Sequence, residues 1–303
     1  MLFKRLLKQD ECTPKYGLIR RSDEKCGLGS YIITIAGGIY YCLEHNLIPI
    51  VDLKNGNNMY KESLDDNAWE HFFKQPYGMC LEDIDDYKSC SIIDAGEMSC
   101  RPKLTMDFLT NENGIAFWRD FVKKYIVLSG EAKEVVDKYL EEYLPGDTRD
   151  KTIGVLARGT DYLSLQPLGH PVQPSITELI REINKVSEKT GYKRIFLATE
   201  DKSISDALCE EYGENVILPN SERFCISEKA YLADVLSDRT NVKMGQDYLA
   251  SLIVLANCRC LVAGRTSGTV VAKLFSNGFE EEVLFNLGMY KIDDKESLHN
   301  EFL

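Results

Sequence analysis

The residues best suited to chemistry follow a short apolar run in the second half of the chain. The run is Gly154-Val-Leu-Ala-Arg158-Gly-Thr-Asp161, and it places an arginine at the end of a predicted strand. Such an arginine presents a fixed fork of N–H donors that suits phosphate oxygens, because strand carboxyl ends face the ligand crevice of open α/β sheets. The alternative is a plain surface ion pair between Arg158 and Asp161.

A second turn has the composition of an anion-binding site. It is Val262-Ala-Gly264-Arg265-Thr266-Ser267-Gly268-Thr269, in which small and hydroxyl-bearing residues join a predicted strand to a predicted helix. Free backbone N–H groups at such a turn attract an anion, although the spacing is not that of a P-loop. The same residues also suit an ordinary capped turn with Thr266 or Ser267 as the N-cap.

Polar or flexible residues mark four further positions, which are Gly27 with Gly29, Asp52, His170, and the run Thr199-Glu200-Asp201. Gly27 and Gly29 form a turn before a helix, but they are fewer glycines than the dinucleotide-binding pattern requires. Asp52 ends a buried strand, where it suits either a hydroxyl-rich ligand or a loop cap. His170 suits a ligand donor or general base, or simply a rigid loop between prolines.

Alternating apolar runs and amphipathic helices must position these residues, and this pattern predicts an α/β fold with parallel sheets. We expect strands at 16–20, 46–52, 152–157, 194–199, 216–218 and 259–263. We expect helices at 31–45, 67–73, 112–125, 130–143, 174–190, 203–212, 247–257 and 269–276. A Pro/Gly/Asp cluster at 144–150 divides the chain into two Rossmann-like domains, 1–150 and 151–303, which face a ligand cleft.

The charge of the chain excludes a general nucleic-acid binder. Its 303 residues carry 36 basic and 48 acidic side chains, a net charge of −12, without a basic stripe. The acidic excess lies mainly in 61–90 and 278–303, whereas 239–277 holds five basic residues against Asp247 alone. This distribution predicts a basic donor pocket in the second half, with acidic segments available for solubility or for a neutral sugar acceptor.

Cysteine and histidine usage predicts a cytoplasmic protein without a metal site. The 10 cysteines form no CxxC pair, no signal peptide is evident, and none of the 4 histidines has metal-ligand spacing. The longest nearly apolar run, 31–43, is shorter than the ~20 residues that span a bilayer. The basic, amphipathic segment 1–8 suits a weak contact with the inner face of the membrane, a first strand or a frayed terminus.

Four motifs in order resemble the α-1,6-fucosyltransferase branch of the glycosyltransferases over about 120 residues. Residues 154–161 look like that family's G-V-H-V-R-R-T-D, and His170-Pro171 follows the arginine at the family's spacing. Residues 193–201 look like its K-R-[IV]-[FY]-L-A-T-D-D, and 261–267 stand where it has L-V-x-x-x-S-S.

The resemblance implies a GT-B-like fold, a GDP-sugar donor, no metal or other cofactor, and inverting transfer to a glycan hydroxyl. It assigns Arg158 to the donor β-phosphate and the 266–267 hydroxyls to the pyrophosphate. Asp247 is the acid available to read guanine, although strict spacing points to Ser251. The expected donor-binding set is Arg158, Asp247, Gly264, Arg265, Thr266, Ser267, Gly268, Thr199, Gly27 and Gly29. Asp52 is the expected acceptor-binding residue.

Three departures from the family pattern bear on catalysis. Leu156 replaces a histidine, Gly159 replaces a second arginine, and Gln166 replaces the glutamate that is the family's proposed base. Glutamine cannot accept a proton, so the base candidates are Asp161, His170, Asp52 and Glu200. Arg158, Asp161 and His170 form the expected catalytic set, and Arg265 is a substitute for the missing arginine.

These patterns together predict a bacterial-type glycosyltransferase of polysaccharide or lipid-linked glycan assembly, with fucose as one candidate sugar. Two alternatives stay open: another sugar-nucleotide enzyme of the epimerase type, and a non-catalytic nucleotide- or glycan-binding protein.

Overall fold

Two parallel sheets form the framework of the protein. The computed structural model describes residues 15–23, 25–84, 89–225, 232, 236 and 241–292. The first sheet has the order β2-β1-β3, with β1 at Tyr16–Arg20, β2 at Ile48–Val51 and β3 at Ser91–Asp94. The second has the order β6-β5-β4-β7-β8, with strands β4 (Thr152–Leu156), β5 (Arg194–Ala198), β6 (Val216–Ile217), β7 (Cys260–Ala263) and β8 (Glu281–Leu284). The expected α/β class is confirmed.

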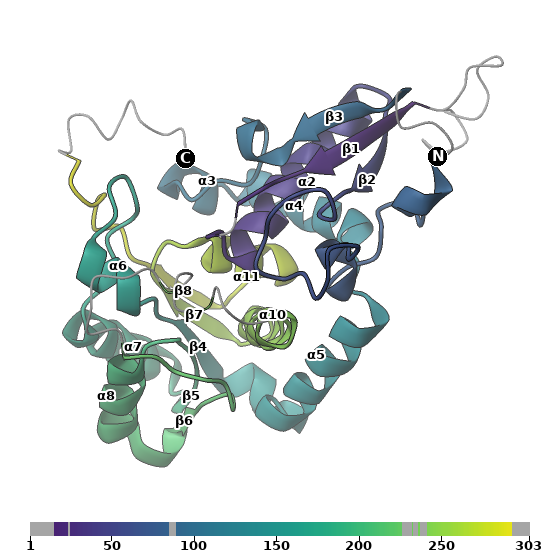
Figure 1. Cartoon of the computed structure of the whole chain (residues 1–303). Helices are drawn as coiled ribbons and strands as arrows, with labels where there is room; N and C mark the ends of the chain where they lie inside the picture. Colours follow the sequence, from purple (N-terminus) through teal and green to yellow (C-terminus); the bar gives the residue numbers. More distant parts are fainter. Residues whose placement is uncertain are drawn as a thin grey trace.

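Helices pack around both sheets (Figure 1). The described helices are α2 (Leu28–Glu44), α3 (Met106–Leu109), α4 (Glu112–Tyr125), α5 (Gly130–Tyr143), α6 (Thr160–Leu165), α7 (Ile176–Thr190), α8 (Lys202–Tyr212), α10 (Val242–Ala256) and α11 (Ser267–Phe275). Local sequence signals explain where several of these helices begin and end. Ser175 and Glu178 form a capping box at the start of α7, and Gly191 ends that helix at φ 79°.

Burial explains why the second half reads as nearly continuous apolar runs. Every residue of β4 is buried, because helices cover both faces of its sheet. Helix α10 is buried along most of its length between that sheet, α5 and α11. A helix that is buried on most of its faces needs apolar residues on most of them, and the second half of α10 has such a sequence.

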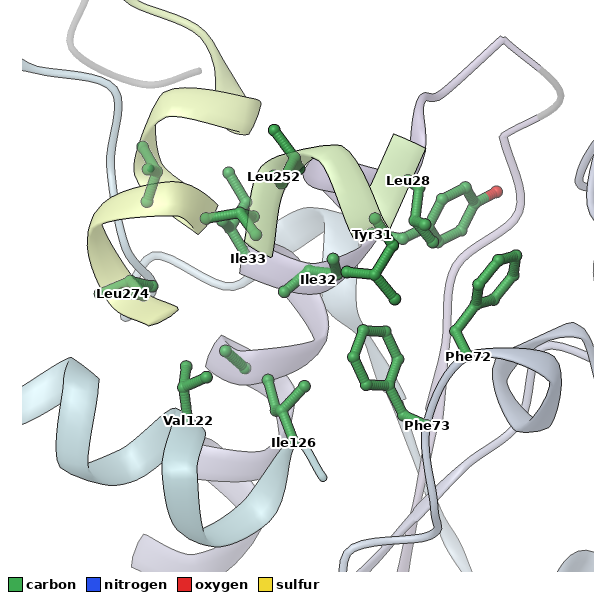
Figure 2. Packing of buried hydrophobic residues seen from close by; sticks show 14 of the residues in the cluster. Leu28, Tyr31, Ile32, Ile33, Phe72, Phe73, Val122, Ile126, Leu252 and Leu274 are labelled. Carbon is green, nitrogen blue, oxygen red and sulfur yellow. The ribbon is translucent and has the colours of Figure 1, made fainter. Parts of the chain in front are cut away.

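The two halves share one hydrophobic core. Figure 2 shows Ile32 of α2 among side chains from other elements, which include Leu252 of α10, Leu274 of α11 and Val122 of α4. The predicted boundary falls in a 3-10 segment, Gly146–Lys151, between α5 and β4. Helix α5 precedes this segment yet packs against α10, which follows it. The division into domains 1–150 and 151–303 stays a prediction.

Some element predictions were wrong at their ends. Helix α10 begins at Val242 rather than at residue 247, and the helix expected at 67–73 is a 3-10 turn, Ala68–His71. Strands β3 and β8 were not predicted. Three of the four residues of β3 are exposed and β8 begins with two glutamates, so neither has the apolar run expected of a buried strand.

Over the described residues, no helix combines the length and apolarity needed to cross a bilayer. The nine cysteines that the structure describes are free thiols. The amphipathic segment 1–8 lies outside the described residues.

Candidate functional site

Strand order creates a crevice in each sheet. In the second sheet the chain adds β5 and β6 on one side of β4, and then β7 and β8 on the other. The carboxyl ends of β4 and β7 therefore meet at a switch point, where the following segments diverge and leave room for a ligand. The first sheet repeats this arrangement around β1, which lies between β2 and β3.

Both crevices open into one cleft with a volume of about 1270 Å³. Most of the residues predicted from sequence line it, and these are Gly27, Gly29, Arg158, Asp161, His170, Thr199, Asp247, Arg265, Thr266 and Ser267. Glu200, Ser251 and Leu156 line it as well. Of the predicted set, Asp52, Gly264 and Gly268 do not line the cleft. The exposed Gln166 does not line it either.

Two helix N-termini meet at the cleft. Helix α2 begins after Gly27, and α11 begins after Thr266. A side-chain carbon on Gly29 would lie 3.1 Å from both the Gly268 nitrogen and Ser267 Oγ, so the two first turns touch. Thr266 Oγ1 accepts a hydrogen bond from the Thr269 N–H at 3.2 Å, which confirms the capped-turn interpretation. In α2 the Leu28 N–H already donates to the Tyr60 hydroxyl at 2.8 Å and the Ser30 N–H to the Gly27 carbonyl at 3.0 Å. The N–H groups of Gly29, Ser267 and Gly268 have no acceptor among the described residues, and together they favour an anion.

Gly264 and Gly268 flank the turn before α11 and lack the side chains that its neighbours would exclude. A side-chain carbon on Gly264 would overlap Gln173 Oε1, and one on Gly268 would overlap the Tyr248 hydroxyl. The Gln173 amide also donates to the Arg265 carbonyl at 3.1 Å. These glycines therefore allow a close approach of neighbouring side chains to the turn.

Arg265 is a buried cation beside this turn. Its side chain is only 8% exposed, and Nη2 donates to the Gly288 carbonyl at 3.0 Å. Its Nε has no hydrogen-bond partner, and no carboxylate of the described residues lies within ion-pair distance of it. Burial lowers the pKa of Arg265. A buried positive charge without a counter-ion is costly, so an anion bound here would be stabilising.

Arg158, by contrast, is already paired. Its guanidinium contacts Asp161 Oδ1 at 2.8 Å and Glu200 Oε1 at 3.1 Å, and the side chain is 25% exposed. Burial opposes its charge, but Glu200 and Asp161 outweigh that effect and raise the pKa of Arg158. The ion pair with Asp161 that the sequence left as an alternative is therefore present, and Glu200 extends it.

Two carboxylates from the end of β5 clamp the turn after β4. Glu200 Oε1 accepts from the Gly159 N–H at 2.9 Å, and Asp201 Oδ2 accepts from the Thr160 N–H at 2.7 Å. Thr160 has φ 43°, an uncommon conformation for a β-branched residue. A side-chain carbon on Gly159 would overlap the Asp201 carboxylate. In this chain, a larger residue at position 159 would require Asp201 to move.

The other base candidates occupy different environments. His170 Nδ1 lies 3.1 Å from the Tyr162 hydroxyl, and burial lowers the pKa of His170. Asp52 is fully buried in an ion pair with Arg20 Nε at 2.6 Å, and it accepts hydrogen bonds from Asn55. Because Asp52 faces these partners rather than the cleft, the loop-cap alternative describes its position.

Sequence reasoning missed several cleft residues. Arg21 follows the last residue of β1, so the strand-end rule used for Arg158 could have found it. Tyr248 lies on α10 between Asp247 and Ser251, where helical spacing was the available signal. Arg101 comes from a loop, and no sequence pattern distinguishes it.

The basic segment 239–277 does not give the cleft a positively charged lining. Lys243 pairs with Asp247, Arg259 with Glu280, and Lys273 with Glu282. Of the basic residues described in this segment, Arg265 alone lines the cleft. The described residues of the acidic stretch 61–90 do not line it either. The prediction of a basic pocket from the described part of that segment was therefore wrong, because Asp247 within it and Glu280 and Glu282 beyond it pair with three of its basic residues.

Neither a family model nor a curated protein sequence matches this chain. Several solved structures do match. A fucosyltransferase NodZ from Bradyrhizobium is 16% identical, with 92% of this chain and 98% of that chain covered and a TM-score of 0.54. The fold is GT-B-like. A mutant of Arabidopsis thaliana FUT1 in complex with GDP is 14% identical, with 94% and 75% covered and a TM-score of 0.54. POFUT1 in complex with GDP is 9% identical, with 91% and 99% covered and a TM-score of 0.50. The GT-B-like architecture expected from the motifs is confirmed, and the residue assignments stay predictions.

Proposed function

We propose that this protein is a glycosyltransferase that moves a sugar from a GDP-sugar to a glycan hydroxyl, with inversion and without a metal. The observation that carries the proposal is the meeting of two helix N-termini beside Arg265, a buried cation with an unpartnered Nε. That arrangement suits a diphosphate. The similar structures support the donor class, because they are fucosyltransferases and the FUT1 and POFUT1 structures hold GDP.

The diphosphate would lie between α2 and α11. The first-turn N–H groups, the Ser267 hydroxyl and Arg265 would stabilise the charge that develops as the diphosphate leaves. Arg158 can add to this while keeping both carboxylates, because a guanidinium has five N–H donors and its two ion pairs leave others free for a phosphate oxygen. Guanine would lie toward α10, where Asp247 and Ser251 both line the cleft.

A single displacement needs one base near the acceptor hydroxyl. Asp161, Glu200 and His170 line the cleft and are the candidates that we keep. The first two are held by Arg158, at 2.8 Å and 3.1 Å. His170 stays neutral near pH 7, because burial lowers its pKa. A role in polysaccharide or lipid-linked glycan assembly on the cytoplasmic side rests on the sequence resemblance.

A ligand-binding panel tests the donor class. Thermal unfolding with GDP, UDP, TDP, CMP and their sugars should show stabilisation by GDP and GDP-sugars, about 2.7 kcal/mol at 100 times the dissociation constant. A preference for another nucleotide would contradict the GDP assignment. Incubation with GDP-fucose and a glycan pool should then release GDP only when an acceptor is present.

The same assay separates the alternative functions. Conversion of the GDP-sugar into another nucleotide sugar without an acceptor would indicate an epimerase-type enzyme. GDP binding without turnover on any acceptor would indicate a non-catalytic binding protein.

A further inference from the structure

We infer that the first-half wall of the cleft binds an oxyanion on the acceptor, so that the acceptor is an acidic sugar or a phosphosugar. This inference rests on the proposed function and names its acceptor class. It starts from two arginines, Arg21 and Arg101, which line the cleft in the half of the chain opposite Arg158 and Arg265.

Arg21 is held in place on α2. Its Nη1 donates to Ser30 Oγ at 3.0 Å and to Thr34 Oγ1 at 2.9 Å, and its guanidinium lies 5.4 Å from the centre of the Tyr31 ring. Its Nη2 forms a long ion pair with Asp23 Oδ2, at 3.4 Å. With its side chain 15% exposed, Arg21 is a fixed positive charge at the edge of the cleft.

Arg101 packs on the same face of α2. A side-chain carbon on Gly37 would lie 2.6 Å from the Cys100 carbonyl and 2.8 Å from Arg101 Cβ, so only glycine permits this contact. Gly37 lies three residues after Thr34, on the same face of α2. Arg101 therefore contacts the helix face whose Ser30 and Thr34 bind Arg21. Arg101 Nη1 donates to the Gly96 carbonyl at 3.0 Å.

The charge of Arg101 is not balanced by a carboxylate. Among the described residues, no acidic group lies within ion-pair distance of it. Burial and the nearby charge of Arg21 both lower the pKa of Arg101. Two like charges beside one cavity repel each other, and a bound anion would relieve that repulsion.

Arg21 contacts Ser30 in the first turn of α2, but Arg101 is anchored at Gly37, about two helical turns further along, so we assign the pair to the acceptor rather than to the donor. The proposed diphosphate site already has Arg265, Arg158 and two helix N-termini. Among described lining residues, the first half contributes Arg21, Lys25 and Arg101 against Asp23 and Asp107. A carboxylate or a phosphate suits the planar fork of an arginine. A uronic-acid residue and a sugar phosphate both supply such a group.

The test uses full-length protein saturated with GDP and three probes: methyl β-glucuronide, N-acetylglucosamine 1-phosphate and the neutral methyl β-glucoside. Isothermal titration or ligand-observed NMR should show at least one anionic probe binding about 10-fold more tightly than the neutral one. The stronger anionic probe identifies the group as carboxylate or phosphate. Arg101→Gln should lower that affinity about 10-fold and change the GDP dissociation constant less than about twofold.

Lys103→Gln is the matched control, because it removes one charge from the same loop at a position that does not line the cleft. It should leave both affinities unchanged. Equal binding of charged and neutral probes, or no anion binding, would overturn the inference. An equal loss of GDP affinity in Arg101→Gln would instead place Arg101 in the donor site. Titrations without GDP separate this result from failure of the proposed donor.

Discussion

Gly159 and Asp201 stand so close that a side-chain carbon on Gly159 would overlap the Asp201 carboxylate. That carboxylate accepts a hydrogen bond from the Thr160 N–H, which holds Thr160 at its positive φ. The turn that orients Arg158 therefore depends on the absence of a side chain at position 159.

The Gly159→Ala variant should be destabilised by about 1–3 kcal/mol, because Asp201 must move and its buried hydrogen bond is weakened. Urea unfolding measures the change. Gly130→Ala is the control, since nothing lies within 4 Å of a side-chain carbon added there. A Gly159→Ala protein as stable as the control would show that the turn has room to adjust.

Arg265→Met should separate ligand binding from stability. Loss of the buried guanidinium removes a proposed diphosphate contact, so GDP affinity should fall about 10-fold or more. The free energy of unfolding without ligand should change by less than about 1 kcal/mol, because no ion pair is broken and a buried charge is removed. Calorimetric titration and urea unfolding measure the two effects.

Arg259→Met, at an exposed ion pair outside the cleft, is the control. A loss of stability with unchanged GDP affinity would assign Arg265 a structural role.

Gly268→Ala should weaken GDP binding, because its methyl group would overlap the Tyr248 hydroxyl and displace the first turn of α11. Tyr248→Phe removes that hydroxyl, so the double variant should recover part of the loss. The coupling energy from a double-mutant cycle is the measurement. Strictly additive effects would refute the contact as the cause.

The pH dependence of activity should identify the base. If His170 is the base, kcat/KM should fall with pH only below about 6.5, because burial lowers the pKa of His170 from that ordinary value. His170→Gln should then lower activity and remove this pH dependence. If a carboxylate is the base, His170→Gln should leave the shape of the pH profile unchanged, whereas Glu200→Gln or Asp161→Asn should abolish transfer.

His170 should also affect stability with a defined sign. Its folded pKa is lowered, so the unfolded chain binds the proton first and stability falls as pH drops from about 6.5 toward the folded pKa. His170→Gln should reduce that slope in urea unfolding measured across the same pH range. An unchanged slope would show that other groups control it.

Asp52→Asn should lower the free energy of unfolding by about 1–3 kcal/mol, because it breaks the buried side of the pair with Arg20 and weakens the Asn55 contacts. GDP affinity and acceptor KM should not change, since Asp52 does not line the cleft. A specific rise in acceptor KM would restore the acceptor-binding prediction.

The sequence by itself determined the α/β class and most element bounds. It also determined the local chemistry of two turns, because apolar periodicity, helix caps and strand-end residues act over a few positions. Helices α4 and α5 have their predicted bounds, and Arg158 and Arg265 lie where strand ends meet.

Only the tertiary structure decided which of these local features face one another. Long-range packing brings the Gly29 turn to the Ser267 turn. It also neutralises Lys273 with Glu282 and buries Asp52 on Arg20. Electrostatic energy depends on the distance between groups in space, and residue counts along the chain do not contain that distance. The unpaired positive charge at the cleft therefore comes from single residues such as Arg265, which packing buries without a carboxylate, rather than from the most basic stretch of sequence as a whole.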